Sequence, residues 1–149
     1  MLSLKQQLAA LPLLVLVTAA GAALAPRSAA ADGALAIGVA PKGAQDGFVY
    51  AFNDRRASVR EAEEDALRSC RTSKHGNEAA RKLCRVVATF QGECVAIAMD
   101  PKNGTPGVGW AIGPSLKTAE DRALAQCEVT AGPDRSGFCK IDKSKCDQR

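Results

Sequence analysis

Two stretches of the chain alternate bulky and small side chains in the same way, sixty positions apart. Residues 35–40 (LAIGVA) and 48–53 (FVYAFN) flank a polar segment (PKGAQDG). Residues 95–99 (VAIAM) and 108–112 (VGWAI) flank a second turn-like segment. Alternation with a period of two is typical of half-buried strands, and Gly, Pro and Asp between two such runs favour a turn. Each stretch therefore predicts a β-hairpin.

A helix is predicted after each hairpin. Ser58 and Glu61 form a capping box, in which the serine oxygen accepts from backbone amides and the glutamate reaches back to the cap. Residues 118–121 (TAED) are predicted to play the same part in the second half. Apolar residues then follow at helical spacing on one face: Val59, Ala62, Ala66, Leu67 and Cys70 in the first helix, and Ala119, Ala123, Leu124 and Cys127 in the second.

A third strand follows each helix. It is predicted at residues 84–90 (CRVVATF) and, shorter and more polar, at 138–142 (FCKID). The motif A-E-x-x-A-L-x-x-C recurs fifty-seven positions later, and the hairpin pattern recurs sixty positions later. These matches indicate an internal repeat that divides the chain into two related halves. We therefore predict an α+β fold: a duplicated β-β-α-β unit with pseudo-twofold symmetry, a mostly antiparallel sheet and two short helices, stapled by disulfides. The repeat units are placed at about 34–90 and 94–146.

The N-terminus is typical of a cleavable signal peptide. Lys5 precedes an uncharged apolar run at 8–25, and the small residues that follow suit a signal peptidase. Pro26 moves the expected cleavage to about residue 31. An uncleaved membrane anchor is the alternative, since the run approaches the ~20 residues of a membrane span. We predict a signal peptide at 1–31 and a single domain at 32–149, secreted or periplasmic and without a stable membrane anchor.

Charge excludes some partners. The formal net charge is +4, and it falls to about +2 once Lys5 and Arg27 leave with the signal peptide. That value is too low to indicate nucleic acid or an anionic membrane as the partner. We expect an unknown protein or a component of the cell envelope as the partner.

All six cysteines lie in the predicted mature part, and an even count in a small exported chain favours disulfides. Zinc is the alternative, but it favours closely spaced cysteine pairs and several histidines, and the chain has one histidine. The repeat suggests that Cys70–Cys84 and Cys127–Cys139 are equivalent local disulfides, one in each half. Cys94 and Cys146 then remain, and their bond is predicted to connect the two halves. Six cysteines allow fifteen pairings, and symmetry alone selects this one.

The motifs resemble those of a bacterial family of domains of unknown function, DUF4189. The resemblance rests on A-E-x-x-A-L-x-x-C at 62–70, C-x-V-V at 84–87 and C-x-A-x-A at 94–98, then G-x-G-W-A at 107–111 and a second A-E-x-x-A-L-x-x-C at 119–127. It extends from about Gly33 to Cys146. The resemblance implies a small exported bacterial protein, and it brings no catalytic residue with it.

Few residues are candidates for catalysis or for binding a metal or a phosphate. His75 lies in a polar loop without a recognisable nucleophile or acid, so a solvated histidine is the simpler interpretation. Glu63 and Glu120 occupy matching positions, and brought together they would suit acid–base chemistry or a cation; the alternative is that each favours a helix N-terminus. The glycines at 107–113 lie within a predicted strand, which argues against a phosphate loop. We predict no catalytic residue, metal site or cofactor.

Two surfaces are candidates for contact with a partner. A basic cluster comprises Arg68, Arg71, Lys74, Arg81, Lys82 and Arg85, and it would suit an anionic partner unless it is only a solvated face. A small-residue face comprises Ala36, Gly38, Ala40, Ala51, Ala96, Ala98, Gly109 and Ala111. This face either receives the alanine-rich helices at close range or is a bare docking surface.

These observations favour a non-enzymatic binding or interaction module of the periplasm or the extracellular space. The alternative is a small hydrolase of envelope polymers that uses Glu63 or Glu120 with a polar neighbour. A structural protein without a soluble ligand is a third possibility, for which the sequence offers no diagnostic residue.

Overall fold

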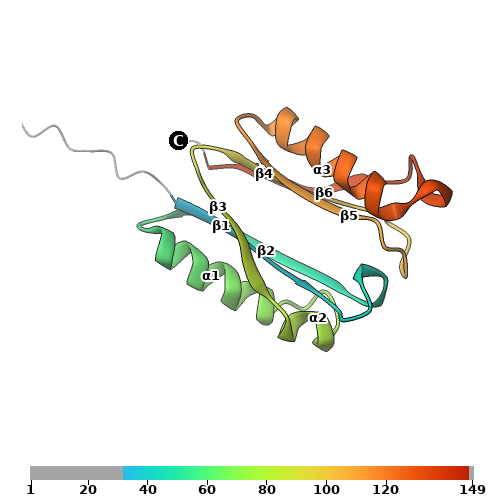
Figure 1. The fold of residues 1–149 in the computed structure, drawn as a ribbon. Coiled ribbons are helices and arrows are strands. Elements are labelled where there is room, and N and C mark those ends of the chain that lie inside the picture. Colours follow the sequence, from blue (N-terminus) through green and yellow to red (C-terminus); the bar gives the residue numbers. More distant parts are fainter. Residues whose placement is uncertain (1–31, 148–149) are drawn as a thin grey trace, which may run out of the picture.

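The computed structural model describes residues 32–147. Two three-stranded antiparallel sheets stack face to face, and each carries helices on its outer face (Figure 1). The predicted signal peptide and its cleavage site lie outside the described residues.

The first half contains one sheet with strand order β2-β1-β3. Its elements are β1 (Asp32–Val39), a 3-10 turn (Ala44–Asp46), β2 (Phe48–Arg56), α1 (Val59–Arg71), α2 (Glu78–Lys82) and β3 (Arg85–Gln91). Ser58 Oγ accepts from the amide of Glu61 at 3.2 Å, as the capping box predicts. The Glu61 carboxylate reaches back one residue further than predicted, to the amide of Ala57 at 3.2 Å.

The second half repeats this order as β5-β4-β6. Its elements are β4 (Cys94–Met99), β5 (Val108–Gly113), α3 (Leu116–Ala131), a 3-10 turn (Pro133–Arg135) and β6 (Lys140–Cys146). The hairpin register is the same in both halves, since Ile37 pairs with Tyr50 and Ile97 with Trp110. The α+β fold with two similar antiparallel sheets is thus confirmed, and the two sheets are consistent with a duplicated unit.

Several element boundaries differ from the predicted ones. The second helix begins one turn early, because Ser115 rather than Thr118 is its cap: Ser115 Oγ accepts from the amide of Thr118 at 3.2 Å. It also continues four residues beyond Cys127. The last strand begins at Lys140 and has seven residues, because it pairs with β4 along its length.

One helix was not predicted. The sequence predicts a loop around His75, but α2 forms where Asn77 Oδ1 accepts from the amide of Ala80 at 2.9 Å. Asparagine is a strong N-cap, so a five-residue helix forms within a polar stretch.

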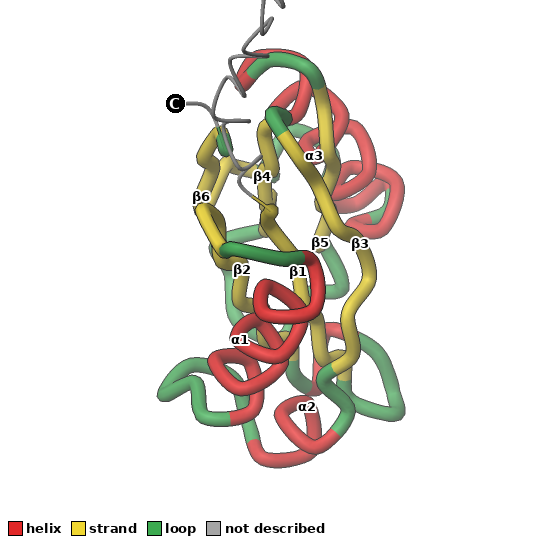
Figure 2. Tube along the Cα trace, turned by 90° about the vertical axis from the view of Figure 1, so that its left-hand side faces the viewer, coloured by secondary structure: helices red, strands yellow, loops and turns green. Residues whose placement is uncertain are grey.

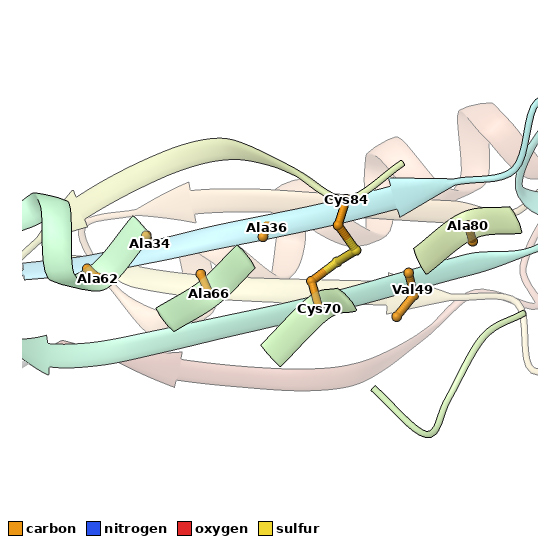
Figure 3. Packing of buried hydrophobic residues seen from close by; sticks show 8 residues of the cluster. All are labelled: Ala34, Ala36, Val49, Ala62, Ala66, Cys70, Ala80 and Cys84. Atoms are coloured by element: carbon orange, nitrogen blue, oxygen red, sulfur yellow. A yellow bond between two sulfur atoms is a disulfide. The ribbon is translucent and has the colours of Figure 1, made fainter. Parts of the chain in front are cut away.

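The core lies in three layers. Between the sheets, Leu35, Ile37, Phe90, Val95 and Ile97 form a buried cluster of bulky side chains. The other face of each sheet packs against helices through small residues: Figure 3 shows this in the first half, where alanines of β1, α1 and α2 meet Val49 and the disulfide. The equivalent second-half layer lies between β4 and α3.

The small-residue face is therefore covered, and the docking alternative for it is excluded. Ala36, Ala96 and Ala98 are fully buried. A Cβ on Gly38 would collide with the carbonyl of Ala80, and one on Gly109 with the carbonyl of Ala123. Helix backbone thus touches strand backbone in both halves, and only glycine permits that approach.

The cysteines pair as the repeat predicts, in bonds Cys70–Cys84, Cys94–Cys146 and Cys127–Cys139. The role predicted for one bond was wrong. Cys94 and Cys146 are opposite each other on β4 and β6, so their bond closes the second sheet and does not tie the halves together. The halves are joined by the chain at Gly92 and Glu93 and by side-chain contacts.

Candidate functional site

A groove of about 1040 Å³ lies along β2, which is an edge strand of the first sheet. Consecutive residues 48–52 of β2 line it. Its other lining comes from the hairpin turn at 44–47, from Ser69 of α1 and the segment between α1 and α2, from the end of β4 and the segment between β4 and β5, and from Asp142 and Lys143 of β6. Both halves therefore contribute to one concave site, and its volume is at the upper end of the range typical of ligand pockets.

An aromatic ladder on β2 faces the second sheet. The ring centroids of Phe48 and Tyr50 are 6.0 Å apart, and those of Tyr50 and Phe52 are 6.4 Å apart and nearly parallel. The ammonium of Lys143 lies 5.4 Å from the centre of the Phe52 ring, within cation–π range. The three rings alternate with Val49 and Ala51, so the ladder follows directly from the period-two pattern of β2.

The tyrosine hydroxyl links the halves. Tyr50 Oη donates to the carboxylate of Asp142, which is the extra residue of a bulge in β6. Burial, together with the hydrogen bond to Asp142, raises the pKa of Tyr50 well above its usual value. Beside this contact, Lys145 Nζ lies 2.8 Å from Asp54 Oδ2. The β2 edge is therefore held against β6 with its phenol protonated.

A compact turn forms one wall of the groove. Asn77 caps α2 and also donates to the carbonyl of Asp46 in the hairpin turn. The Arg81 guanidinium donates to the carbonyl of Ser73 at 3.1 Å, and Gly76 lies against the carbonyl of Phe48. These contacts fix the turn that carries His75.

A buried ion pair fixes the opposite wall. The Asp100 carboxylate accepts from Arg135 Nε at 2.7 Å and from Nη2 at 2.8 Å, and from the amide of Lys102 at 2.9 Å. The hydrogen bonds from Arg135 lower the pKa of Asp100 to about 2. The Arg135 guanidinium also lies 4.0 Å from the centre of the Phe138 ring. Asp100 thus holds the β4–β5 turn and is not available as a free acid.

The outer edges of β2 and β5 differ. In both hairpins the first residue after the inner strand donates to the last turn residue: Ala40 to Gly47 and Asp100 to Gly107, each at 2.9 Å. Bonding then alternates along the ladder, so Phe48, Tyr50 and Phe52 direct their backbone groups away from β1, as Val108, Trp110 and Ile112 direct theirs away from β4.

On β5, side chains of α3 satisfy these groups. Thr130 Oγ1 accepts from the amide of Val108 at 2.9 Å and donates to its carbonyl at 2.7 Å. Gln126 Oε1 accepts from the amide of Trp110 at 2.8 Å, and Arg122 donates to the carbonyl of Ile112 at 3.2 Å. Residues four apart on a helix thus match residues two apart on a strand.

On β2 the matching caps are missing. The positions that correspond to those three side chains are Asp65 and Ser69 in α1 and Ser73, two residues beyond the end of α1. Asp65 pairs instead with Arg56 at 2.6 Å and with Arg68 at 3.0 Å. Within residues 32–147, no side chain hydrogen-bonds to the outward backbone groups of Tyr50 and Phe52. The floor of the groove is therefore a strand edge with unsatisfied donors and acceptors.

The predicted acidic pair is not assembled. Glu63 lies on α1 and Glu120 on α3, and these helices are on opposite outer layers of the molecule, as Figures 1 and 2 show. Glu120 accepts from Ser144 Oγ at 2.6 Å. The glycines at 107–113 lie in and before β5, as predicted, and pack against α3.

The basic cluster is partly occupied by local contacts. Arg68 pairs with Asp65, Lys82 with Glu78 at 2.6 Å, and Arg81 with backbone carbonyls. Arg71, Lys74 and Arg85 form no ion pair with any other residue between 32 and 147. His75, by contrast, lines the groove.

The family model of a domain of unknown function, DUF4189, matches residues 33–146. The chain belongs to the DUF4189 family. No curated protein and no solved structure matches it. For this DUF4189 domain, three disulfides indicate an oxidising compartment. No helix of residues 32–147 is long and apolar enough to cross a membrane.

The sequence pattern of this DUF4189 domain does not indicate the groove. The sequence predicts the floor of the groove only as a hairpin strand and its walls as loops of separate halves. One signal was present: Gln126 and Thr130 have no counterparts of equal length at Ser69 and Ser73. Across the described part of the chain, no three His, Cys, Asp or Glu side chains converge into a metal-binding group.

Proposed function

We propose that this DUF4189 chain is an exported, non-enzymatic binding module, and that the groove along β2 is its binding site. The observation that carries the proposal is the open edge of β2 at the floor of a groove built from both halves. A disulfide-closed frame supports it, because rigid walls reduce the entropy lost on binding. The N-terminal segment and the disulfides support a periplasmic or extracellular location.

The hydrolase alternative has less support. Glu63 and Glu120 lie on opposite outer helices, neither lines the groove, and Glu120 is engaged by Ser144. That hypothesis needs one of these glutamates, with a polar neighbour, to face a substrate site, and neither faces the groove.

The proposal is tested by using the protein to capture a partner from envelope extract. The full chain is expressed with export, so that its disulfides form. Asn103→Trp places a large side chain at the groove rim, while Arg60→Trp places the same side chain on the exposed face of α1. We expect a partner identified by mass spectrometry to be retained by the wild type and by Arg60→Trp, and lost at least tenfold with Asn103→Trp.

The basic cluster is the competing surface. Replacing Arg71, Lys74 and Arg85 together by Ser leaves the groove intact. Loss of the partner with this variant, and retention with Asn103→Trp, would place the site on the basic cluster and refute the groove. Retention of no partner by the wild type would refute the binding role.

A further inference from the structure

The two sheets have four edge strands, and three of them are protected against pairing. An unprotected edge offers a row of backbone donors and acceptors to any extended chain, so proteins cover, bend or charge such edges. The edge of β5 is covered by Arg122, Gln126 and Thr130. β3 carries a bulge at Val87 and β6 one at Asp142, each of which interrupts the regular ladder.

The remaining edge, β2, has no side-chain cap, bulge or charge over residues 48–53. Its bulge is at its far end, where Arg55 adopts a positive φ of 58°. Its sequence there (FVYAFN) carries no charge, whereas β6 carries three lysines. The turn at Gly76 shields the carbonyl of Phe48, so the open part of the edge runs from Tyr50 onward.

We propose that an extended peptide segment of a partner protein binds in the groove by adding a strand to the edge of β2. This inference rests on the binding role proposed above and specifies how the groove works. Tyr50 and Phe52 each offer one outward N–H and one outward C=O, so an added strand would gain four backbone hydrogen bonds. Main-chain pairing of this kind gives affinity, and the side chains on either face give specificity.

The lining defines the chemistry of the segment. On one face the added side chains would lie beside the rings of Tyr50 and Phe52, which favours large apolar residues as cross-strand neighbours. On the other face they would lie beside Ala51 and Ser69, which favours small residues.

Charge complementarity favours an uncharged segment. Asp100 is neutralised by Arg135, and the remaining lining carboxylates, Asp46 and Asp142, balance Lys102 and Lys143. The expected ligand is therefore an uncharged strand that alternates large apolar and small residues. A second copy of this chain fits less well, because it would bring a helix and a second sheet to a groove that already has walls on both faces of β2.

The experiment uses the exported, oxidised protein and a phage library of random eight-residue peptides. We expect enriched peptides with alternating large apolar and small residues. Their binding should slow hydrogen exchange of the Tyr50 and Phe52 amides at least tenfold. Methylation of the peptide nitrogens that face β2 should abolish binding, while methylation of the alternate nitrogens should have little effect. Enrichment of no peptide, or equal effects of both methylation patterns, would overturn strand addition.

A matched pair of variants tests the same point from the protein side. Ser69→Gln supplies the side chain that caps Trp110 in the other half, and we expect it to slow exchange of the Tyr50 amide and to weaken the peptides at least tenfold. Arg60→Gln places the same side chain on the exposed face of α1, outside the groove, and should bind normally. Retained binding by a Ser69→Gln protein whose Tyr50 amide is protected would refute the proposal.

Two further results separate the possible failures. If an envelope partner is still lost with Asn103→Trp but no peptide binds β2, strand addition is wrong and the binding role stands. If neither partner nor peptide binds, both proposals fail. A concentration-dependent dimer in sedimentation, abolished by Ser69→Gln, would identify a second copy as the occupant and refute the partner peptide.

Discussion

The two halves share strand order and the register of their hairpins, yet their outer edges are completed differently. In the second half a helix of sixteen residues lies along β5, and its side chains satisfy the strand edge. In the first half the corresponding positions are too short, or are engaged elsewhere, and β2 is left open beside a groove. Two sheets with the same strand order can therefore have different roles: one closes its outer edge and the other exposes it.

We expect the largest effect on stability from removing a disulfide. The disulfides of the two halves close loops of unequal length, so their removal should cost different amounts. Replacing Cys94 and Cys146 by Ala should reduce the free energy of unfolding by about 4 kcal/mol, because that bond closes a loop of 52 residues. Replacing Cys70 and Cys84, which close 14 residues, should cost about 3 kcal/mol. Urea unfolding of the oxidised variants measures both values. A larger loss in the first half would contradict the ranking.

The next effect concerns the glycines beneath the helices. Gly109→Ala should cost about 3 kcal/mol, because its methyl group meets the backbone of α3, a long helix held by a disulfide. Gly38→Ala meets α2, which has five residues and can shift, so we expect about 2 kcal/mol or less. Thermal unfolding of the two variants provides the comparison, and equal losses would show that α2 is as firmly held as α3.

Acid should act on the second half through Asp100. Its folded-state pKa, about 2, lies below its ordinary value of 3.8, so its contribution to stability is present above about pH 4 and is lost as the pH falls toward 2. Asp100→Asn should reduce stability at neutral pH and flatten its decline between pH 4 and 2. The equivalent position in the first half is Ala40, which has no carboxylate, so no corresponding loss of stability is expected from the first half. Urea midpoints against pH, for both proteins, test this; parallel curves would exclude the role of Asp100.

We expect the smallest effect on stability from removing one of the α3 side chains that hydrogen-bond to the outer edge of β5. Gln126→Ala leaves the Trp110 amide without its partner and should cost about 1 kcal/mol. Ser69→Ala, at the matching position, should cost almost nothing. Amide exchange gives the sharper readout: Trp110 should exchange slowly in the wild type, and in Gln126→Ala its rate should approach that of Tyr50. Slow exchange of Tyr50 in the wild type would show that the β2 edge is covered.

Much of the fold follows from the sequence because the repeat supplies evidence twice. Matched hairpins fix the strands, and matched cysteines select one disulfide pairing of many. Residue size alone left the alanine face open between helix cover and a docking surface, and the structure decides for helix cover. The start of α3 was misplaced because Ser115 and Thr118 are both good caps, and only one can begin the helix.

The site was harder to predict because it depends on distances between elements. Whether a strand edge is satisfied depends on the reach of a side chain on another element, as with Gln126 and Ser69. The groove also requires both halves, and sequence patterns describe each half alone. The acidic pair was proposed for the opposite reason: Glu63 and Glu120 match in sequence, but the layers between α1 and α3 separate them.

Since no disulfide crosses between the halves, Gly92 and Glu93 are the only covalent link between them in the described chain. Cleavage by a protease there would leave two fragments, each with its own disulfides and each with a complete three-stranded sheet. The contacts of Tyr50 with Asp142 and of Asp54 with Lys145 would then act as an interface between two molecules. The domain can thus be regarded as a dimer whose two subunits share one chain, and it is a natural candidate for a split reporter that reassembles.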